Sequence, residues 1–313
     1  MKVSVLLTTY NHEKWIAQAI DSTLMQETNF DYEVVITEDC STDSTRDIVI
    51  DFQRRYPGKI RLILSEKNKN DNTNLVTAWQ TSPSQYVAWL DGDDFWTSPD
   101  KLRKQVAFLD THPECAMCFH NALRFYEDGS RKSKTYNADN QKEFSTLEDI
   151  WASNFIAGCS PMFRKDLFRE FPGWYSYTNI WGDWPLYILS AQYGKIGYID
   201  EVMGAYRVHA GGTWSSLNDI EKLEELLKFY ETMNANLNFR YNEIVSTIIS
   251  RRCVKLAVER EEQRREVQQL RQRIRKLERR IQNLDQRSQI GRNSKTWKLL
   301  KRFASIRAKV LRK

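Results

Sequence analysis

The chain has 313 residues, of which 41% are hydrophobic and 12% aromatic, and these values are ordinary for a globular protein with its own core. No apolar run approaches the length of a bilayer span, and Met1–Leu7 is too short and too soon polar for a signal peptide. We therefore expect a cytoplasmic protein.

The net charge of +6 is unevenly distributed along the chain. Residues 251–313 hold 22 Lys and Arg against 6 Asp and Glu, whereas residues 1–250 hold 25 against 35. The acidic body is a poor binder of polyanions, so only the C-terminal part could attract nucleic acid or an anionic membrane. The five cysteines are odd in number and scattered, which predicts free thiols rather than a disulfide framework.

The N-terminal part alternates between strand and helix patterns. Strand patterns occupy 3–9, 32–37, 60–64 and 86–90, and helical patterns occupy 13–26, 43–56 and 75–81. This alternation predicts a parallel sheet flanked by helices.

Polar side chains follow three of these strands: Thr8 and Tyr10, then Asp39, then Asp91 and Asp93. Because the carboxyl ends of parallel strands meet at one edge of a sheet, we expect these side chains to converge. An Asp-x-Asp pair on a tight turn can hold Mg²⁺ or Mn²⁺ and leave coordination positions open for substrate phosphates. The alternative is a solvated turn that caps the next helix.

The sequence contains neither a Gly-x-Gly-x-x-Gly fingerprint nor a Gly-Lys-Ser/Thr phosphate loop. Val3–Asn11, Glu38–Asp43 and Leu90–Asp94 resemble, in order and spacing, the successive motifs of family 2 glycosyltransferases with the GT-A fold. The resemblance covers about residues 1–215. It implies an α/β fold in which a Rossmann-like mixed sheet is flanked by helices.

This resemblance implies roles for the residues at the strand ends. Thr8, Tyr10 and Asp39 would hold the base and ribose of a nucleoside-diphosphate sugar, with Asp39 accepting the ring N–H of a pyrimidine. Asp91 would meet the ribose and the metal. Asp93 would bind the Mn²⁺ or Mg²⁺ ion on the diphosphate.

The usual Asp-Asp-Gly-Ser motif of the family is altered at two positions. Glu38 replaces the first Asp, and Cys40 replaces the glycine. The choice of base is therefore left open, although a UDP-sugar remains the first expectation.

Asp183 stands between Trp181 and Trp184, before a helical pattern over 185–193. Two indoles would desolvate the carboxylate and favour its use as a base. The resembling family places its catalytic base at an acid that opens a helix in this region, and Asp183 matches that position. This implies an inverting transfer. The alternative is a helix N-cap, and the two roles are compatible.

Arg207 and His209 alternate with apolar residues after a strand pattern at 201–205, and the glycines at 211 and 212 let the backbone approach a phosphate. In the family, a histidine near here closes over the diphosphate or completes the metal site, whereas a lone histidine is more often structural. The Gln-x-x-Arg-Trp motif of processive polymerases is absent, which favours transfer of a single sugar.

Residues 216–290 predict a long helix. A heptad pattern places Val267, Ile274 and Ile281 at a and Leu270, Leu277 and Leu284 at d. In a parallel dimer, each g residue faces the e residue five positions later in the partner helix. These pairs all have opposite charges: Glu266 with Arg271, Arg273 with Glu278, and Arg280 with Asp285. The pattern predicts a parallel homodimeric coiled coil, and the alternative is a helix packed on its own domain.

The segment 291–313 is basic and amphipathic. Leu299, Phe303, Ile306 and Val310 keep helical spacing, and 294–313 holds eight Lys and Arg and no acids. This pattern predicts binding to an anionic membrane surface, at the inner face of the plasma membrane. No motif that reads bases accompanies it, so we expect no nucleic-acid partner.

The sequence thus predicts a GT-A glycosyltransferase domain at 1–215, a coiled-coil extension at 216–290 and a basic tail at 291–313. The expected activity is inverting, metal-dependent transfer from a nucleoside-diphosphate sugar to a glycan or lipid-linked acceptor in cell-surface polysaccharide synthesis. One alternative is a non-catalytic coiled-coil scaffold whose transferase-like domain binds glycan or nucleotide. Another is a nucleotidyl- or phosphotransferase, which is disfavoured because no activating lysine accompanies the first strand.

Overall fold

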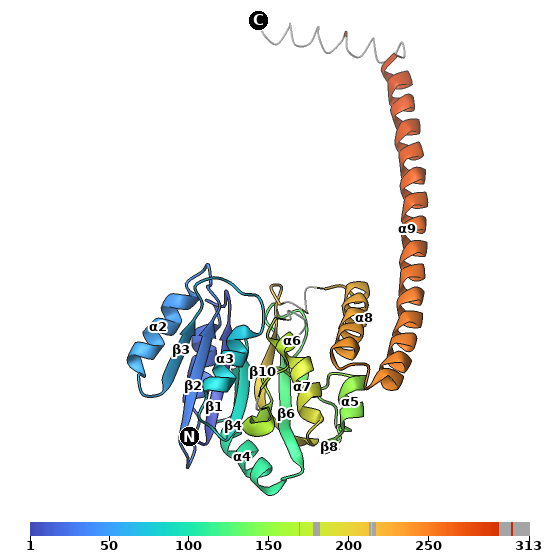
Figure 1. Ribbon diagram of the computed structural model, residues 1–313. Coiled ribbons are helices and arrows are strands. Elements are labelled where there is room, and N and C mark those ends of the chain that lie inside the picture. Colours follow the sequence, from blue (N-terminus) through green and yellow to red (C-terminus); the bar gives the residue numbers. More distant parts are fainter. Residues whose placement is uncertain (169, 178–181, 213, 215–216, 294–301, 303–313) are drawn as a thin grey trace, which may run out of the picture. The chain divides into compact units, whose positions relative to one another are not determined.

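The computed structural model describes residues 1–168, 170–177, 182–212, 214, 217–293 and 302 (Figure 1). The chain divides into two compact units, Met1–Ser250 and Arg251–Lys313. The apolar face predicted for the basic tail lies outside the described residues, and so does Trp181.

A mixed sheet forms the centre of the first unit, in the strand order β3-β2-β1-β4-β9-β6-β10-β5. These strands are β1 (Val3–Thr9), β2 (Tyr32–Glu38), β3 (Ile60–Leu64), β4 (Tyr86–Asp91), β5 (Phe95–Trp96), β6 (Cys115–Tyr126), β9 (Met162–Arg164) and β10 (Lys195–Val208). The strands β1 to β4 pair in parallel, whereas β9 is antiparallel to both β4 and β6, and β5 is antiparallel to β10. Two short strands, β7 (Lys134–Thr135) and β8 (Phe144–Ser145), pair with β6 and β10.

Helices cover both faces of this sheet. The helices α1 (Ile16–Leu24), α2 (Thr45–Arg55) and α4 (Lys101–Thr111) share one hydrophobic cluster with Val3, Val5 and Leu7 of β1. The helices α3 (Thr73–Thr81), α5 (Leu147–Ala152), α7 (Asp183–Ala191) and α8 (Asp219–Asn236) share the other cluster with Leu6. This alternation is the period of two that a strand with two buried faces requires.

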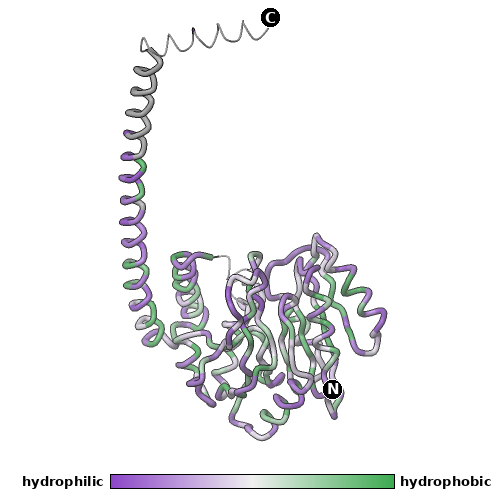
Figure 2. The backbone as a smooth tube through the Cα atoms, turned by 180° about the vertical axis from the view of Figure 1, so that it is seen from behind, coloured by the Kyte–Doolittle hydropathy of each residue, from purple (hydrophilic) through white to green (hydrophobic). Residues whose placement is uncertain are grey.

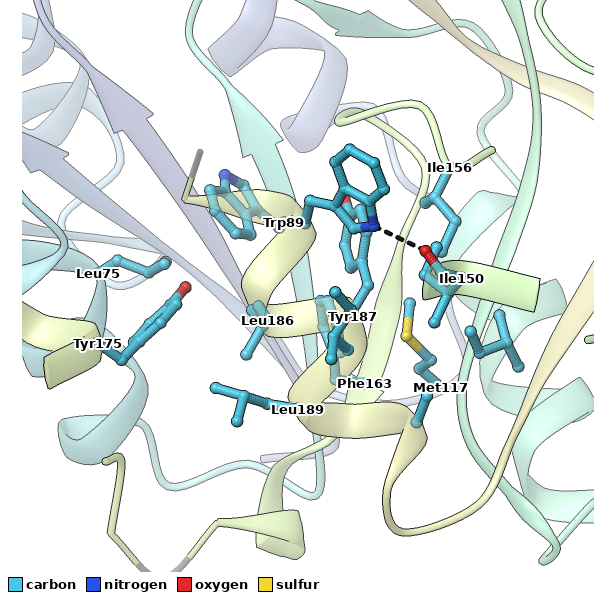
Figure 3. Packing of buried hydrophobic residues seen from close by; sticks show 14 of the residues in the cluster. Leu75, Trp89, Met117, Ile150, Ile156, Phe163, Tyr175, Leu186, Tyr187 and Leu189 are labelled. Carbon is cyan, nitrogen blue, oxygen red and sulfur yellow. Dashed lines mark hydrogen bonds between the residues drawn. The ribbon is translucent and has the colours of Figure 1, made fainter. Parts of the chain in front are cut away.

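The second cluster is rich in aromatic side chains. Figure 3 shows Leu186, Tyr187 and Leu189 of α7 gathered with Phe163 of β9, and the Phe163 and Tyr187 rings stack 6.1 Å apart. The Trp184 indole belongs to the same core, where it donates a hydrogen bond to the Ile150 carbonyl and stacks on Phe229 of α8. Trp184 therefore fastens α7 to α5 and α8.

The first unit extends beyond the predicted 1–215 domain because α8 and the start of α9 (Asn242–Asn293) bury Tyr230, Met233 and Val245 in the same core. The predicted domain boundaries stay predictions. A short 3₁₀ turn (Lys165–Leu167) and α6 (Gly173–Ser176) complete the elements.

The long C-terminal helix is present as α9. Figure 2 shows its described part as largely hydrophilic with isolated hydrophobic positions, and Leu270 and Ile274 are more than half exposed. None of the described helices is long and apolar enough to cross a membrane. All five cysteines are free thiols, as the sequence predicts.

Candidate active site

The carboxylates after β4 lie on a tight turn. The Gly92 N–H donates to the Thr8 carbonyl over 2.8 Å, and the Asp94 N–H donates to the Asp91 carbonyl over 3.0 Å. Because β1 and β4 pair in parallel with Thr8 beside Asp91, the turn leaves the sheet at the end of β1. The structure thus brings together two of the predicted strand ends.

Asp91 is held by donors on the sheet. Its Oδ1 atom accepts hydrogen bonds from the Thr8 hydroxyl at 2.6 Å and from the Trp89 indole at 3.1 Å. Burial, together with the charge of Asp93, raises the pKa of Asp91 to about 7. This carboxyl group therefore changes protonation near neutral pH.

Asp93 faces two histidines. Its Oδ2 atom lies 3.0 Å from Nε2 of His209 and 4.0 Å from Nε2 of His12. Burial alone would raise the pKa of Asp93, but the hydrogen bond with His209 and the charge of His12 outweigh it, so the pKa lies below its usual range. Burial lowers the pKa of His12. Of the two carboxyl groups Asp91 and Asp93, Asp93 is thus the one that is ionised.

Glycine is required between the two aspartates. A Cβ atom at Gly92 would lie 2.7 Å from Oγ1 of Thr9 and 2.8 Å from Nδ1 of His12. These distances are too short for any side chain, so Gly92 allows His12 and Thr9 to pack directly against the turn.

Arg207 fixes the back of the turn. Its backbone N–H donates to Asp94 Oδ1, its Nε to the Asp93 carbonyl and its Nη2 to Gln18 Oε1, each over 2.7 Å. Its Nη1 lies 3.6 Å from Glu127. Burial raises the pKa of Asp94 well above its usual range. Arg207 therefore holds the turn through hydrogen bonds to the Asp93 carbonyl and to the buried carboxyl group of Asp94.

Trp15 supports His209 from the other side. The two rings are in contact, with their centroids 4.1 Å apart and their planes tilted by 48°, and the indole N–H donates a 2.6 Å hydrogen bond to Glu127. This contact sets the plane of the imidazole that faces Asp93.

Asp39 lies at the end of the neighbouring strand, where its carboxylate is already engaged. It accepts hydrogen bonds from the backbone N–H groups of Lys69 and Asn70 at 3.1 to 3.2 Å and from the Asn74 amide at 2.9 Å. Asp39 therefore orders the loop after β3. Tyr10, directly after β1, is 39% exposed.

The two departures in the Glu38–Asp43 motif have different structural consequences. Glu38 is fully buried and pairs with Arg46 of α2, and it also accepts the Ser41 N–H. Cys40 adopts a φ of 61°, a conformation that glycine adopts without steric cost. A larger residue is thus accepted where the family motif has glycine.

Asp183 is the first residue of α7, with Gly182 as the N-cap. Its carboxylate accepts the Trp184 N–H at 2.6 Å and lies 3.5 Å from the Asn154 amide, and burial raises its pKa. The N-cap is therefore Gly182 and not Asp183, contrary to the capping alternative, although the Asp183 carboxylate accepts the N–H of the next residue at the helix start. Trp184 is a core residue, and because Trp181 lies outside the described residues the predicted pair of indoles stays a prediction.

The start of α7 lies beside the Asp-x-Asp strand. A Cβ atom at Gly182 would lie 3.4 Å from the Trp89 ring, whose N–H binds Asp91. The charge of Asp183 also contributes to the raised pKa of Asp91. Asp183 and Asp91 are therefore close enough for their charges to interact.

The chemistry of Asp93 and His209 suits a divalent cation. Adjacent ligand atoms at about 2.1 Å from one ion lie roughly 3 Å apart, and the 3.0 Å spacing of Asp93 Oδ2 and His209 Nε2 matches that value. Among the described residues, no three His, Cys, Asp or Glu side chains form an assembled metal site. The pair could therefore hold one side of an ion whose other ligands would have to come from a bound molecule.

Four residues of the site were not singled out in the sequence: His12, Trp15, Trp89 and Asn74. His12 and Trp15 follow the end of β1, so their place at the same sheet edge was the available signal. The contact of Asn74 with Asp39 depends on the path of the loop after β3, which no local pattern indicates.

Comparison with known proteins shows which proteins this chain resembles. The Glycosyl transferase family 2 model matches residues 4–171, more than half of the chain. An uncharacterized protein of Mycobacterium tuberculosis is 35% identical over 232 residues, which cover 74% of this chain and 64% of that protein. The chain thus spans less than two thirds of the length of that relative.

A second relative is the poly(ribitol-phosphate) beta-N-acetylglucosaminyltransferase TarS of Staphylococcus aureus, 33% identical over 36% of this chain and 19% of TarS. The structure of TarS residues 1–349 with UDP-GlcNAc gives a TM-score of 0.57 at 21% identity, covering 75% of this chain and 66% of that one.

A mannosyltransferase from Pyrobaculum calidifontis, solved with GDP-Man and Mn²⁺, also gives a TM-score of 0.57, at 17% identity over 82% of this chain and 75% of its own. These likenesses confirm the predicted GT-A fold, a mixed α/β sheet flanked by helices.

Proposed function

The chain belongs to glycosyltransferase family 2, and on this basis we propose that it transfers a sugar from a nucleoside-diphosphate sugar to a glycan or lipid-linked acceptor in cell-surface polysaccharide synthesis. The proposal is supported by the pairing of Asp93 with His209 and by the separate carboxyl group of Asp183, whose charge acts on Asp91. Transfer with inversion needs two such groups, one for the leaving diphosphate and one for the acceptor.

The donor would lie across the ends of β1, β2 and β4. Tyr10 is exposed there and can cover a base, and the backbone that Asp39 orders at Lys69 and Asn70 borders the same place. Thr8 orients Asp91, whose carboxylate would accept a ribose hydroxyl. UDP-sugar is the first expectation because the TarS structure contains UDP-GlcNAc, and GDP-sugar is the second because the mannosyltransferase contains GDP-Man.

Asp93 and His209, with Asp91 beside them, would hold Mn²⁺ or Mg²⁺. When bound, the ion supplies positive charge that stabilises the leaving diphosphate. Arg207 and Trp15 keep the two ligands in place through the Asp93 carbonyl and the His209 ring.

Asp183 would accept the proton of the acceptor hydroxyl as that oxygen attacks the anomeric carbon. Burial raises the pKa of Asp183 toward neutral pH, and the carboxylate is therefore a stronger base than that of an exposed aspartate. The hydrogen bond from the Trp184 N–H fixes its direction. A single carboxylate on the acceptor side favours inversion over a double displacement.

The C-terminal part would bring the domain to its acceptor. We expect α9 to pair with a second copy as a parallel coiled coil, because Leu270 and Ile274 of the heptad seam are exposed and the flanking charges are complementary. The basic segment 294–313 would bind an anionic membrane at its inner face, where lipid-linked acceptors are found. Removing 294–313 should then abolish sedimentation with anionic liposomes.

The test is hydrolysis of UDP-sugars with Mn²⁺ by the wild type and by Asp183→Asn, with Asp166→Asn as the control at an exposed aspartate. We expect release of UDP by the wild type and the control, and a loss of at least about a hundredfold in Asp183→Asn with nucleotide binding retained. Equal hydrolysis by Asp183→Asn would contradict its role as the base. Nucleotide binding without any turnover would favour the scaffold alternative.

A further inference from the structure

One short segment between α5 and β9 lies against both Asp183 and Asp91. At its start, the Asn154 amide is 3.5 Å from Oδ2 of Asp183. Four residues later, a Cβ atom at Gly158 would lie 3.1 Å from Oδ2 of Asp91. Residues 154–158 therefore link the carboxyl group proposed as the base to the end of the Asp-x-Asp strand.

The amide of Asn154 has one orientation that satisfies its neighbours. Its Oδ1 atom accepts the Ile156 N–H at 3.1 Å. A backbone N–H needs an acceptor, and a flipped amide would oppose it with an NH₂ group. The Nδ2 atom therefore faces Asp183 and donates to its Oδ2 atom.

Each oxygen atom of Asp183 thus has a donor from a different part of the chain. Oδ1 accepts the Trp184 N–H at 2.6 Å at the start of α7, and Oδ2 has the Asn154 amide. A carboxylate held by one donor can turn about that bond, whereas two donors fix its plane. Asp183 and Asn154 are both only partly buried, so the carboxylate stays accessible.

The backbone around Asn154 is itself anchored. The Phe155 carbonyl accepts a 2.7 Å hydrogen bond from the Asn137 amide, and the Asn137 N–H donates to Oδ1 of Asn121 in β6 over 3.0 Å. Ile156 is buried in the hydrophobic cluster drawn in Figure 3. Asn154 is therefore presented to Asp183 from a segment that is tied to the sheet.

The contact also acts on the charge of Asp183. Burial raises the pKa of this carboxyl group, and the hydrogen bonds from the Trp184 N–H and the Asn154 amide lower it, because they favour the ionised form. A base has to be ionised before it can take a proton. Hydrogen bonds at catalytic groups are often long without substrate and shorten when it binds, and the 3.5 Å distance fits that pattern.

We propose that Asn154 is the positioning residue of Asp183, holding the ionised carboxylate in one plane while residues 154–158 set its separation from Asp91. Asn154 acts through Asp183 and does not itself touch the reacting atoms. The inference rests on the proposed function, in which Asp183 is the base. It adds a residue from the loop after α5 to the acceptor side of the site.

The experiment uses two substitutions that keep an acceptor for the Ile156 N–H. Asn154→Asp has the same shape but replaces the donor with a second carboxylate. Asn154→Ser can accept the same N–H through its hydroxyl, as serine does in turns, but is too short to reach Asp183. The matched control is Asn140→Asp, at an exposed asparagine.

Hydrolysis of UDP-sugar with Mn²⁺ by the full chain is measured from pH 5.5 to 9. Because both variants lose the donor that favours the ionised carboxylate, the pH at which kcat rises should move upward, and further in Asn154→Asp than in Asn154→Ser. We expect kcat of Asn154→Asp at pH 7 to fall at least about tenfold and to recover in part at pH 9. KM for the donor should stay within about twofold of the wild type. A purely structural role in the loop would leave the pH profile unchanged.

A second measurement does not depend on turnover. Carbon-13 NMR of the aspartate carboxyl groups in the metal-free protein follows the titration of Asp183, whose signal is identified by its absence in Asp183→Asn. We expect the pKa of Asp183 to be higher in Asn154→Asp than in the wild type, and unchanged in Asn140→Asp.

The outcomes separate this inference from the proposed function. Loss of hydrolysis in Asp183→Asn, with an unchanged pH profile and an unchanged Asp183 titration in both Asn154 variants, would overturn the role of Asn154 and leave the transferase intact. Full hydrolysis by Asp183→Asn would overturn the proposed base and its positioning residue together. If the wild type does not turn over UDP-sugar, an unchanged Asp183 titration in Asn154→Asp still overturns the contact, and a shifted one supports it.

Discussion

The Thr8 hydroxyl donates a 2.6 Å hydrogen bond to Oδ1 of Asp91 across the parallel pairing of β1 and β4. This bond stabilises the ionised carboxylate, while burial and the charge of Asp93 favour the protonated form and raise the pKa of Asp91 to about 7. The charge at the end of β4 is therefore set by a balance that one residue on the neighbouring strand influences.

Replacing Thr8 with valine should shift this balance. The loss of a hydrogen bond to a charged group corresponds to about 1.5–3 kcal/mol, so the pKa of Asp91 should rise by about one to two units. We expect UDP affinity in the presence of Mn²⁺ to fall about tenfold at pH 7 and less at pH 9. Calorimetric titration between pH 6.5 and 9 measures this, and a pH dependence identical to that of the wild type would contradict it.

Asp91→Asn should stabilise the metal-free protein. Since the pKa of Asp91 is about 7 in the folded protein against 3.8 for an ordinary aspartate, the unfolded chain loses this proton first and the free energy of unfolding falls as pH rises between those values. Asparagine cannot ionise, so we expect a gain of about 1–3 kcal/mol at pH 8 and little at pH 4.

Urea unfolding in EDTA at both pH values measures this difference. The same variant should lose affinity for UDP, because its amide cannot supply the carboxylate charge. If the wild type and Asp91→Asn had the same free energy of unfolding at pH 8, ionisation of Asp91 would not destabilise the folded protein.

Gly92→Ala should disturb the Asp-x-Asp turn. The new Cβ atom would lie 2.7 Å from Thr9 Oγ1 and 2.8 Å from His12 Nδ1, so one of them must move. We expect a loss of about 1–3 kcal/mol in the free energy of unfolding. The matched control is Gly58→Ala, where a Cβ atom would meet nothing within 4 Å. Equal effects of the two substitutions in urea unfolding would argue against the packing described at Gly92.

The coiled-coil proposal is tested by exchanging charges between Arg273 and Glu278. In a parallel dimer these residues face each other twice, so Arg273→Glu alone creates two repulsive pairs. Each exposed pair contributes about 0.5 kcal/mol, and we expect roughly a tenfold weaker dimer. The double variant with Glu278→Arg should restore it. Sedimentation equilibrium of the full chain gives the answer, and a double variant as weak as the single one would exclude this register.

Much of the fold could be predicted because hydrophobic periodicity is local. The predicted strands at 3–9 and 60–64 coincide with β1 and β3, and the predicted helix at 75–81 lies within α3. The short strands β5 and β9 escaped prediction because they carry too few residues for a period, and pairing with distant strands defines them. The N-terminal strands β1 to β4 are parallel, as their alternation with helices predicts, and the sheet as a whole is mixed, as the family resemblance implies.

The residues of the site that share a sheet edge could be predicted from the sequence. Contacts that depend on packing between distant segments could not. Asp93 and His209 do meet, as the sequence suggested. Trp184 lies in the core, where α5 and α8 offer its indole a carbonyl acceptor and a ring, and the sequence did not indicate these contacts. Sequence gives the identity of such a residue without saying which neighbour it contacts.

In the proposed mechanism, a donor nucleotide binds through a cation held at Asp93. Calorimetric titration of UDP and GDP into the full chain, with Mn²⁺ and with EDTA, tests it in the wild type and in Asp93→Asn. We expect binding of at least one nucleotide that requires Mn²⁺ and is lost in Asp93→Asn. Binding that is equally strong in EDTA, or unchanged in Asp93→Asn, would contradict it.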